Sequence, residues 1–296
     1  MEIRVLRYFI TIAREGNVSR AADALHITQP TLSRQLMQLE EELGVALFER
    51  GRHRLTLTNE GLLLERRANE ILALVDKAEA ELGQVDEYIT GHIAITCGEL
   101  GAVWQLAELI KAFQAKYPQI TYSIYTCNAD TSKERLDSGL ADLALLLEPV
   151  DMERYDFLRL PVKEHWGVLM RADDALAQKA AIAPKDLIGK NIIVPWRSKV
   201  RQELRSWFGE YVSNMNPPML SNMSTNASIM VYNGLGYAFC MAGGRPFLDN
   251  SKIICKPLDP PLTASVALAW KSHQPNSVTV SKFIAFVRES LSKLNN

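Results

Sequence analysis

Apolar residues recur at a helical spacing near the start of the chain, at Leu6, Phe9, Ile10 and Ala13. This i, i+3, i+4, i+7 pattern predicts one buried stripe on a first helix that ends at Gly16. A second short helix is expected to follow directly and to end near His26.

A third helix is predicted after Thr28, which is expected to cap it, with Pro30 in its first turn and Gly44 at its end. Its apolar stripe repeats at spacings of about one helical turn, at Leu32, Leu36, Leu39 and Leu43. Two short helices, a brief turn and a third amphipathic helix are typical of a helix-turn-helix unit.

A short alternating segment comes next, in which Leu55 and Leu57 are separated by polar residues, as in a half-exposed strand. Gly51 supplies a turn before it, so the segment is interpreted as a hairpin, or wing. Basic residues are expected at the tip of this wing: Arg50, Arg52, His53 and Arg54.

A long helix free of proline is predicted from Thr58 to about Tyr88. Its apolar residues follow a seven-residue repeat, with charged residues on the other faces. This seam contains Leu64, Ala68, Ile71, Val75, Ala78 and Leu82. A helix lying on its own domain would also explain the pattern, but so narrow a repeat favours pairing between helices. We therefore expect a homodimer.

Strands and helices alternate beyond Gly91, which indicates an α/β fold class overall. The first group is βαβαβ and predicts a parallel sheet, with elements at 92–97, 103–117, 120–126, 133–138 and 143–147. A second group of strands and helices begins at Trp166. Two similar α/β groups in one chain suggest two lobes with a cleft between them.

Composition narrows the classes of protein. The chain has 296 residues, of which 47% are hydrophobic and 23% charged, so a disordered or collagen-like protein is excluded. Its 33 basic and 34 acidic residues nearly cancel, so an anionic partner must be bound by a local basic cluster. No long apolar run or secretory signal is found, and we expect a cytoplasmic protein that does not contact a membrane.

The chemistry-bearing residues argue against an enzyme. The 5 histidines are scattered, and no GxSxG, HExxH, GxxxxGK or GxGxxG motif occurs. The cysteines form no CxxC pair, so a metal site is not expected, and neither is a cofactor.

The segment 21–61 resembles the N-terminal pattern of the LysR-type transcriptional regulators. The resemblance rests on Gln29-Pro30, Leu32-Ser33-Arg34, Leu39-Glu40, Leu43-Gly44 and Leu47-Phe48, with the paired alanines, Arg50 and Thr58. It implies a winged helix-turn-helix at 1–58, a linker helix at 59–89 and a periplasmic-binding-protein-like effector domain at 90–296. Lobe I would comprise about 90–161 and 265–296, and lobe II about 162–264.

The polar face of the third helix is a candidate DNA-reading surface, because it carries amide, hydroxyl and guanidinium groups and no acid. A merely solvated polar face is the alternative. Contacts with an operator in double-stranded DNA are expected from Ser19, Arg20, Gln29, Pro30, Thr31, Ser33, Arg34, Gln35 and Gln38, together with the wing. Glu40, Glu41 and Glu42 should point away from the phosphates.

The resemblance also implies a small-molecule effector between the lobes, at the carboxyl ends of strands. The candidate residues are Cys97, Gly98, Glu99, Leu100, Asn128, Ala129, Thr131, Trp196, Arg197, Ser198, Thr225 and Asn226. Glu99, Leu100 and Ala129 depart from the small polar residues that are frequent in the family. We expect Glu99 and Arg197 to present opposite charges to a polar ligand that carries a cation or a hydrogen-bond donor. The alternative is that Glu99 caps the helix near Gly101 and pairs with Arg197.

Other hypotheses remain open at this stage. Cys97 and Cys127 each follow a strand, so a thiol-responsive regulator is an alternative to buried structural cysteines. Cys240 and Cys255 form a second candidate pair without obvious activating charge. A free-standing solute-binding receptor is disfavoured by the wing and the missing export signal.

The resemblance further implies a dimer that doubles to a tetramer and contact with RNA polymerase.

Overall fold

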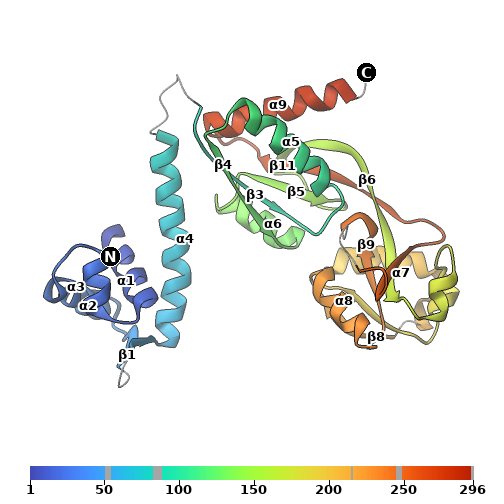
Figure 1. Cartoon of the computed structure of the whole chain (residues 1–296), viewed down its shortest axis with the longest axis horizontal. Coiled ribbons are helices and arrows are strands. Elements are labelled where there is room, and N and C mark those ends of the chain that lie inside the picture. The colour runs from blue at the N-terminus through green and yellow to red at the C-terminus, as the bar shows by residue number, and fades with distance from the viewer. Residues whose placement is uncertain (51–54, 83–88, 215, 245–248, 295–296) are drawn as a thin grey trace. The chain divides into compact units, whose positions relative to one another are not determined.

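The computed structural model describes residues 1–50, 55–82, 89–214, 216–244 and 249–294. The chain divides into two compact units, Met1–Gly83 and Gln84–Asn296 (Figure 1).

Helices dominate the first unit, which contains α1 (Ile3–Glu15), α2 (Val18–Ala24), α3 (Gln29–Leu43), β1 (Phe48–Arg50), β2 (Leu55–Leu57) and α4 (Asn59–Leu82). Gly16 and Gly44 end α1 and α3 at φ angles of 60° and 70°, a left-handed conformation that glycine adopts without strain. Asn17 caps α2 through its side chain. Thr28 precedes α3 as expected, but its hydroxyl contacts the Thr31 hydroxyl at 2.8 Å, so the prediction of a side-chain cap is wrong.

One apolar cluster holds the first unit together. The stripe of α1 packs against α2 and α3, and the Phe9 and Phe48 rings lie 5.4 Å apart. The β1–β2 hairpin is antiparallel, with Arg50 opposite Leu55.

The seam of α4 is partly covered by this same cluster. Ala68 is fully buried there, and Leu64 and Ile71 pack against the cluster. The prediction that these residues face a partner helix is therefore wrong for Ala68 and incomplete for Leu64 and Ile71. Over so few turns a repeat of 3.5 residues cannot be distinguished from the 3.6 repeat of a helix lying on its own domain. Val75 is half-buried and Ala78 is exposed, whereas the side chain of Leu82 lies outside the described residues.

Lobe I of the second unit contains β3 (Gly91–Cys97), α5 (Val103–Lys116), β4 (Ile120–Thr126), α6 (Ala129–Asp137), β5 (Leu143–Leu147) and α9 (Val278–Leu294). The order β4-β3-β5 is parallel throughout, as the βαβαβ pattern predicts. α5 and α9 cover one face, where the Phe113 and Phe283 rings meet at 5.1 Å. Leu136 of α6 packs with Ala144 and Leu146 on the other face.

Lobe II contains β7 (Asn191–Pro195), α7 (Ser198–Phe208), β8 (Asn216–Ser221), α8 (Ser224–Tyr232), β9 (Tyr237–Met241) and β10 (Ile253–Pro257). Short 3₁₀ helices lie at Ala175–Gln178, Pro184–Leu187, Gly209–Asn214 and Ala242–Gly244. The strands β9, β7 and β8 run parallel to one another.

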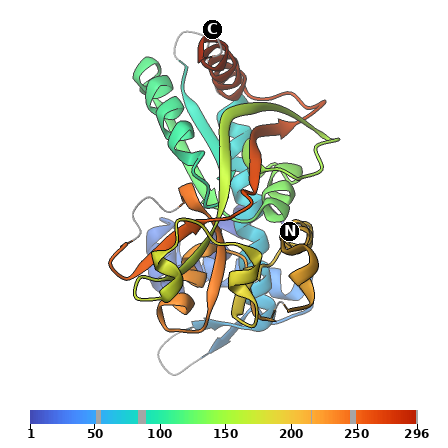
Figure 2. The same cartoon turned by 90° about the vertical axis from the view of Figure 1, so that its right-hand side faces the viewer.

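The long strand β6 (Tyr155–Arg171) runs from one lobe into the other, as Figures 1 and 2 show. Its first part pairs with β11 (Thr263–Lys271), ending with His165 opposite Thr263. Its second part pairs with β9, beginning with Trp166 opposite Met241. The strand therefore changes partners between adjacent residues, at the point where the two lobes meet.

Candidate functional site

The N-terminal end of α3 presents polar side chains to solvent. Gln29, Pro30, Thr31, Arg34 and Gln38 are exposed, and Ser33 and Gln35 are half-buried. Leu32 and Leu39 occupy the opposite, buried side of the helix. Arg34 has no ion-pair partner among the residues that the structure describes, which leaves its guanidinium available to a ligand.

The start of α2 is fixed beside this face. The side-chain oxygen of Asn17 accepts hydrogen bonds from the backbone N–H groups of Ser19 and Arg20, at 2.9 and 3.1 Å. The Arg20 guanidinium donates to the carbonyl of Glu15. Ser19 and Arg20 are both exposed, so they remain accessible to a phosphate.

The acidic end of α3 has a structural role at Glu40. Its carboxylate accepts hydrogen bonds from the backbone N–H groups of Leu47 and Phe48, at 2.6 and 3.2 Å, and thereby fixes the chain as it enters β1. Of the wing residues, Arg50 ends β1 but its side chain is outside the described residues, as are Arg52, His53 and Arg54 altogether.

A cavity of about 140 Å³ lies between the two lobes of the second unit. Strand-end residues of both lobes line it, as predicted: Gly98, Glu99, Leu100, Asn128, Ala129, Trp196 and Arg197. Cys97, Thr131, Ser198, Thr225 and Asn226, which were also predicted, do not.

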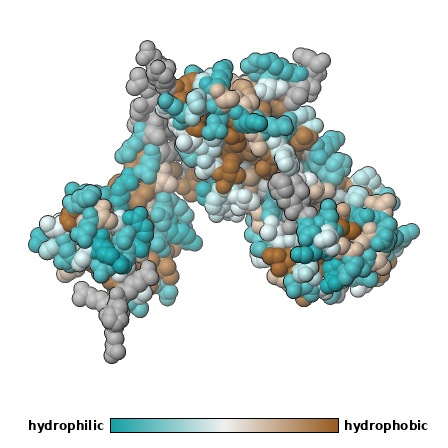
Figure 3. All heavy atoms as spheres, in the orientation of Figure 1, coloured by the Kyte–Doolittle hydropathy of each residue, from teal (hydrophilic) through white to brown (hydrophobic). Residues whose placement is uncertain are grey.

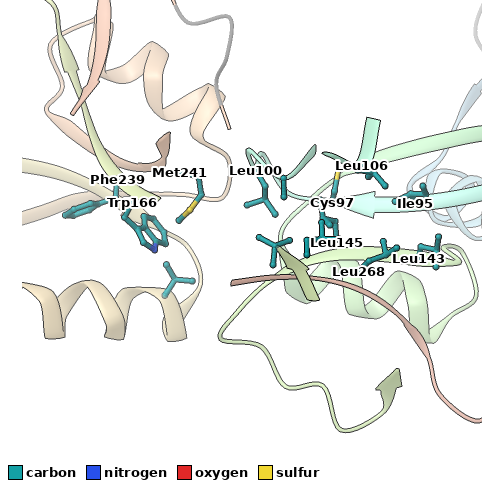
Figure 4. Packing of buried hydrophobic residues seen from close by; sticks show 14 of the residues in the cluster. Ile95, Cys97, Leu100, Leu106, Leu143, Leu145, Trp166, Phe239, Met241 and Leu268 are labelled. Carbon is teal, nitrogen blue, oxygen red and sulfur yellow. The ribbon is translucent and has the colours of Figure 1, made fainter. Parts of the chain in front are cut away.

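The apolar wall of this pocket was not predicted as part of a site. It includes Leu145, Leu147, Trp166, Ile193, Val194, Phe239 and Met241. These residues belong to β5, β6, β7 and β9, whose sequence pattern is that of ordinary buried strands. Figure 4 shows the Met241 side chain on the side of lobe II toward Leu100 of lobe I, with Trp166 beside Met241.

Glu99 connects the lobes. Its carboxylate, which follows β3, accepts backbone hydrogen bonds from Ser224 at 2.7 Å and from Thr225 at 3.0 Å, at the start of α8. The hydroxyls of the same two residues also donate to it. The positive end of the α8 dipole, and first-turn N–H groups that have no acceptor within the helix itself, favour a carboxylate at this position.

Burial raises the pKa of Glu99, but the hydrogen bonds from the Ser224 and Thr225 hydroxyls and N–H groups together outweigh it. The pKa therefore lies below its ordinary value, and the group is ionised at neutral pH. Both oxygens of Glu99 accept hydrogen bonds from lobe II, and the presentation of its charge to a ligand cation stays a prediction.

Arg197 makes a second connection between the lobes. Its guanidinium contacts the carboxylate of Asp130, in the first turn of α6, with both N···O distances at 3.2 Å. The alternative, in which Arg197 pairs with Glu99, is therefore wrong. Asp130, in the first turn of α6, is the partner instead.

Glu164 binds the backbone just before α5, the helix start that the alternative assigned to Glu99. Its side chain lies on β6, is 3% exposed, and accepts a hydrogen bond of 2.7 Å from the N–H of Ala102, just before α5. Asn128 likewise caps α6, accepting from the N–H groups of Asp130 and Thr131. The chain itself thus supplies oxygens to the starts of α5, α6 and α8.

Cys97 and Cys127 do not form the reactive pair that was weighed as an alternative to buried structural cysteines. The Cys127 sulfur contacts the Thr96 hydroxyl at 3.0 Å, whereas Cys97 points to the opposite face of β3 because adjacent strand residues alternate. Burial, with a contribution from Cys127, raises the pKa of Cys97 to about 11. A protonated thiol in the apolar core is a poor nucleophile.

Cys240 and Cys255 lie closer together, with their sulfurs 3.4 Å apart. They pair with β6 from opposite edges, opposite Gly167 and Leu169. Both cysteines are present as thiols, and a thiol-responsive role for this pair stays a prediction.

The described ranges contain neither a metal-binding cluster nor a membrane-spanning helix. No cluster of three or more His, Cys, Asp or Glu side chains suited to a metal ion is found among them. No helix in the described part of the chain has the length and apolar character needed to span a membrane.

Comparison with known proteins assigns both units to one family. Residues 3–62 match the bacterial regulatory helix-turn-helix proteins of the lysR family, and residues 87–292 match the LysR substrate binding domain.

Similar proteins with known names are transcriptional regulators. The chain is 30% identical to the regulator YtlI of Bacillus subtilis (strain 168) over 259 residues, which is 86% of this chain and 82% of that protein. It is 39% identical to the regulator BsdA of the same organism over 161 residues, 54% of this chain and 55% of that protein.

Solved structures show the same fold over almost the full length. HinK, a LysR family transcriptional regulator from Pseudomonas aeruginosa, is 28% identical, with a TM-score of 0.56 and 99% of each chain covered. CbnR complexed with its target DNA is 20% identical, with a TM-score of 0.71, covering 98% of this chain and 100% of that one.

Proposed function

The chain belongs to the LysR family of DNA-binding transcriptional regulators, and on that basis we propose that a small molecule bound between its two lobes controls its action on DNA. The observation that carries this proposal is the cavity at the strand ends of both lobes, within the unit that matches the family's substrate binding domain. Glu99 and Arg197 join the lobes beside this cavity, so a bound molecule would act on the contacts that set the lobe arrangement.

We propose that α3 is the helix that reads the operator. Gln29, Thr31 and Arg34 are exposed near the N-terminal end of α3, and each can bond to base edges in the major groove. Ser19 and Arg20 at the start of α2 are placed to contact phosphates. A regulator of this kind works where the chromosome is, which implies a cytoplasmic location and RNA polymerase as a further partner.

Exposed apolar residues support self-association. Leu62, Leu63 and Leu74 are exposed on α4, by 53%, 54% and 38%. On lobe I, Trp104, Ile124 and Tyr125 are exposed around α5 and β4, where Figure 3 shows apolar side chains gathered. Apolar surfaces on both units suit a homodimer that assembles further into a tetramer.

A metabolite panel tests the proposed control. Compounds that raise the thermal unfolding temperature of the full chain are selected first, because a ligand of the folded state stabilises it by mass action. Each is then added to a gel-shift titration on an operator fragment taken from DNA upstream of the chain's own gene. At least one compound should change operator affinity or the footprint. If every stabilising compound leaves both unchanged, the proposed control is wrong.

A further inference from the structure

The start of α8 in lobe II is capped from the other lobe. Its N-cap residue, Met223, makes no side-chain cap, whereas α2 and α6 are capped by the neighbouring Asn17 and Asn128. At α8 the oxygens come instead from Glu99 of lobe I, 125 positions earlier in the chain. This helix start therefore depends on a carboxylate that its own segment does not supply.

Four donors of this helix start converge on that one carboxylate. The backbone N–H groups of Ser224 and Thr225 donate to Oε2 of Glu99, at 2.7 and 3.0 Å. The Ser224 hydroxyl donates to the same oxygen, and the Thr225 hydroxyl donates to Oε1. We call these four donors the α8 cradle. Such a set of donors at the positive end of a helix is a site for an anion.

The cradle holds its anion without help from a basic side chain. Burial raises the pKa of Glu99, and the hydrogen bonds from Ser224 and Thr225 lower it by more. No described lysine or arginine contributes to this shift. The carboxylate is therefore kept ionised by the cradle alone, as a free carboxylate in the same position would be.

The second charged group in the cavity wall is also satisfied by lobe I. Among the described residues that line the cavity, the other charged one is Arg197, whose guanidinium contacts the Asp130 carboxylate at 3.2 Å. In both links lobe I supplies the anion and lobe II the donors. A ligand carboxylate in the cavity would meet the like charge of Glu99 and donors that are already bonded, which disfavours its binding.

We propose that Glu99 is a specificity-determining residue, which fills the α8 cradle in place of a ligand carboxylate. While Glu99 is in the cradle, no effector places a carboxylate there. The effector is then recognised by the rest of the wall, which includes the polar side chains of Asn128, Ser221 and Asn222. Removal of the Glu99 carboxylate vacates the cradle and gives the pocket a carboxylate site. The inference rests on the proposed function for the role of the effector, but the occupancy of the cradle is tested separately.

The test removes the carboxylate and supplies it again as a free ion. Glu99→Ala keeps Cβ, so the deleted atoms correspond to acetate, and acetamide is a neutral probe of the same shape. Glu99→Gln is the matched control, because its amide still fills the space. Calorimetric titration of the full chain gives the affinities, at a constant ionic strength set with chloride. Thermal unfolding in the same buffers shows whether each variant folds.

Glu99→Ala should bind acetate about tenfold more tightly than acetamide, because charge-assisted hydrogen bonds form only with the anion. The unaltered chain and Glu99→Gln should show no such preference. Thr225→Val, added to Glu99→Ala, should weaken acetate binding by about tenfold, because a donor of the cradle is lost. This double variant reports whether the acetate lies in the cradle.

The proposal would be overturned if Glu99→Ala bound acetate no better than acetamide, or if the unaltered chain showed the same preference for acetate. Acetate binding that Thr225→Val leaves unchanged would also overturn it. Should Glu99→Ala not fold in chloride, it is refolded in acetate and in acetamide. Acetate should then restore the folded protein and acetamide should not, and recovery in neither solution would contradict the cradle.

Failure of the proposed function has a different signature. In that case acetate binds to Glu99→Ala as expected, but no compound that stabilises the unaltered chain changes its binding to the operator.

Discussion

The carboxylate of Glu99, at the end of β3 in lobe I, accepts a hydrogen bond of 2.7 Å from the backbone N–H of Ser224, at the start of α8 in lobe II. The two residues are 125 positions apart in the chain. This contact gives the two-lobed domain an internal anion at a helix start, which is a position that a ligand carboxylate could otherwise occupy. The hydrogen bonds from the start of α8 also explain why the Glu99 carboxylate is compatible with a mostly apolar pocket.

Replacing Glu99 by Gln should weaken the link between the lobes. The amide keeps one acceptor but loses the charge that favours the start of α8, and its NH₂ group faces N–H donors. We expect a loss of about 1 to 2 kcal/mol in the free energy of unfolding. Urea denaturation measures it, and Glu108→Gln, on the exposed side of α5, is the control. Equal stability of Glu99→Gln and the control would contradict the link.

The contribution of Glu99 should depend on pH in a defined direction. Its pKa is lowered from an ordinary value of 4.5, so the folded state favours the ionised form. The stabilisation is therefore complete above the unfolded pKa and is lost as the pH falls through the folded pKa. The stability difference between the unaltered chain and Glu99→Gln should shrink from pH 7 to below pH 4. A stability difference that grows on acidification would show that folding raises the pKa of Glu99 and does not lower it.

Arg34 should contribute to sequence reading. Arg34→Ala is expected to cost about 1 to 3 kcal/mol of operator affinity and to relax specificity at one base pair, because a bidentate contact to guanine is lost. Gel-shift titrations on the operator and on single-base variants measure both effects. Arg205→Ala, exposed on α7 of the second unit, should bind like the parent. If Arg34→Ala also binds the operator with the affinity and specificity of the parent, α3 does not read the operator through this residue.

The wing makes a separate prediction about phosphates. If Arg52 holds a phosphate, Arg52→Ala should weaken binding to all sequences alike. The slope of log affinity against log salt concentration should become smaller by about one, because one fewer counterion is released. The measurement is a salt titration of operator and unrelated DNA. A change confined to the operator would mean that Arg52 reads bases instead.

The exposed leucines of α4 should mediate dimer formation. Leu63 and Leu74 lie on one side of the helix, three turns apart, so Leu63→Glu with Leu74→Glu would place like charges in the interface. Sedimentation should show a monomer that remains folded. Arg66→Glu is the charge control, and Ala68→Glu should unfold the first unit, because Ala68 is fully buried. A folded dimer carrying both leucine substitutions would contradict this surface.

Local patterns predicted much of the fold. The stripes on α1 and α3 depend on residues a few positions apart, and the strongly apolar 143–147 segment could only be a buried strand. The face of α4 was misjudged, because whether a stripe meets its own domain or a partner depends on tertiary packing. The start of β6 at Tyr155 was also missed, since exposed and buried residues alternate irregularly along 155–165.

The site was less predictable than the fold. Strand-end loops identified Glu99 and Arg197 as pocket residues, but neither partner followed from the sequence, because Ser224 and Asp130 approach them only when the lobes come together. Trp166 carried no motif at all. Its place in the pocket wall follows from the partner change of β6 where the lobes meet, which depends on tertiary packing.

The most direct test of ligand control is to fill the pocket and measure operator binding. Ala129 lines the cavity at the start of α6, and Ala129→Phe should occupy the space of a ring while leaving the sequence of α3 unchanged. Operator affinity is measured by gel shift with and without a compound that changes it in the unaltered chain. The account predicts that Ala129→Phe binds the operator and no longer responds to the compound. A response equal to that of the unaltered chain would contradict control through this pocket.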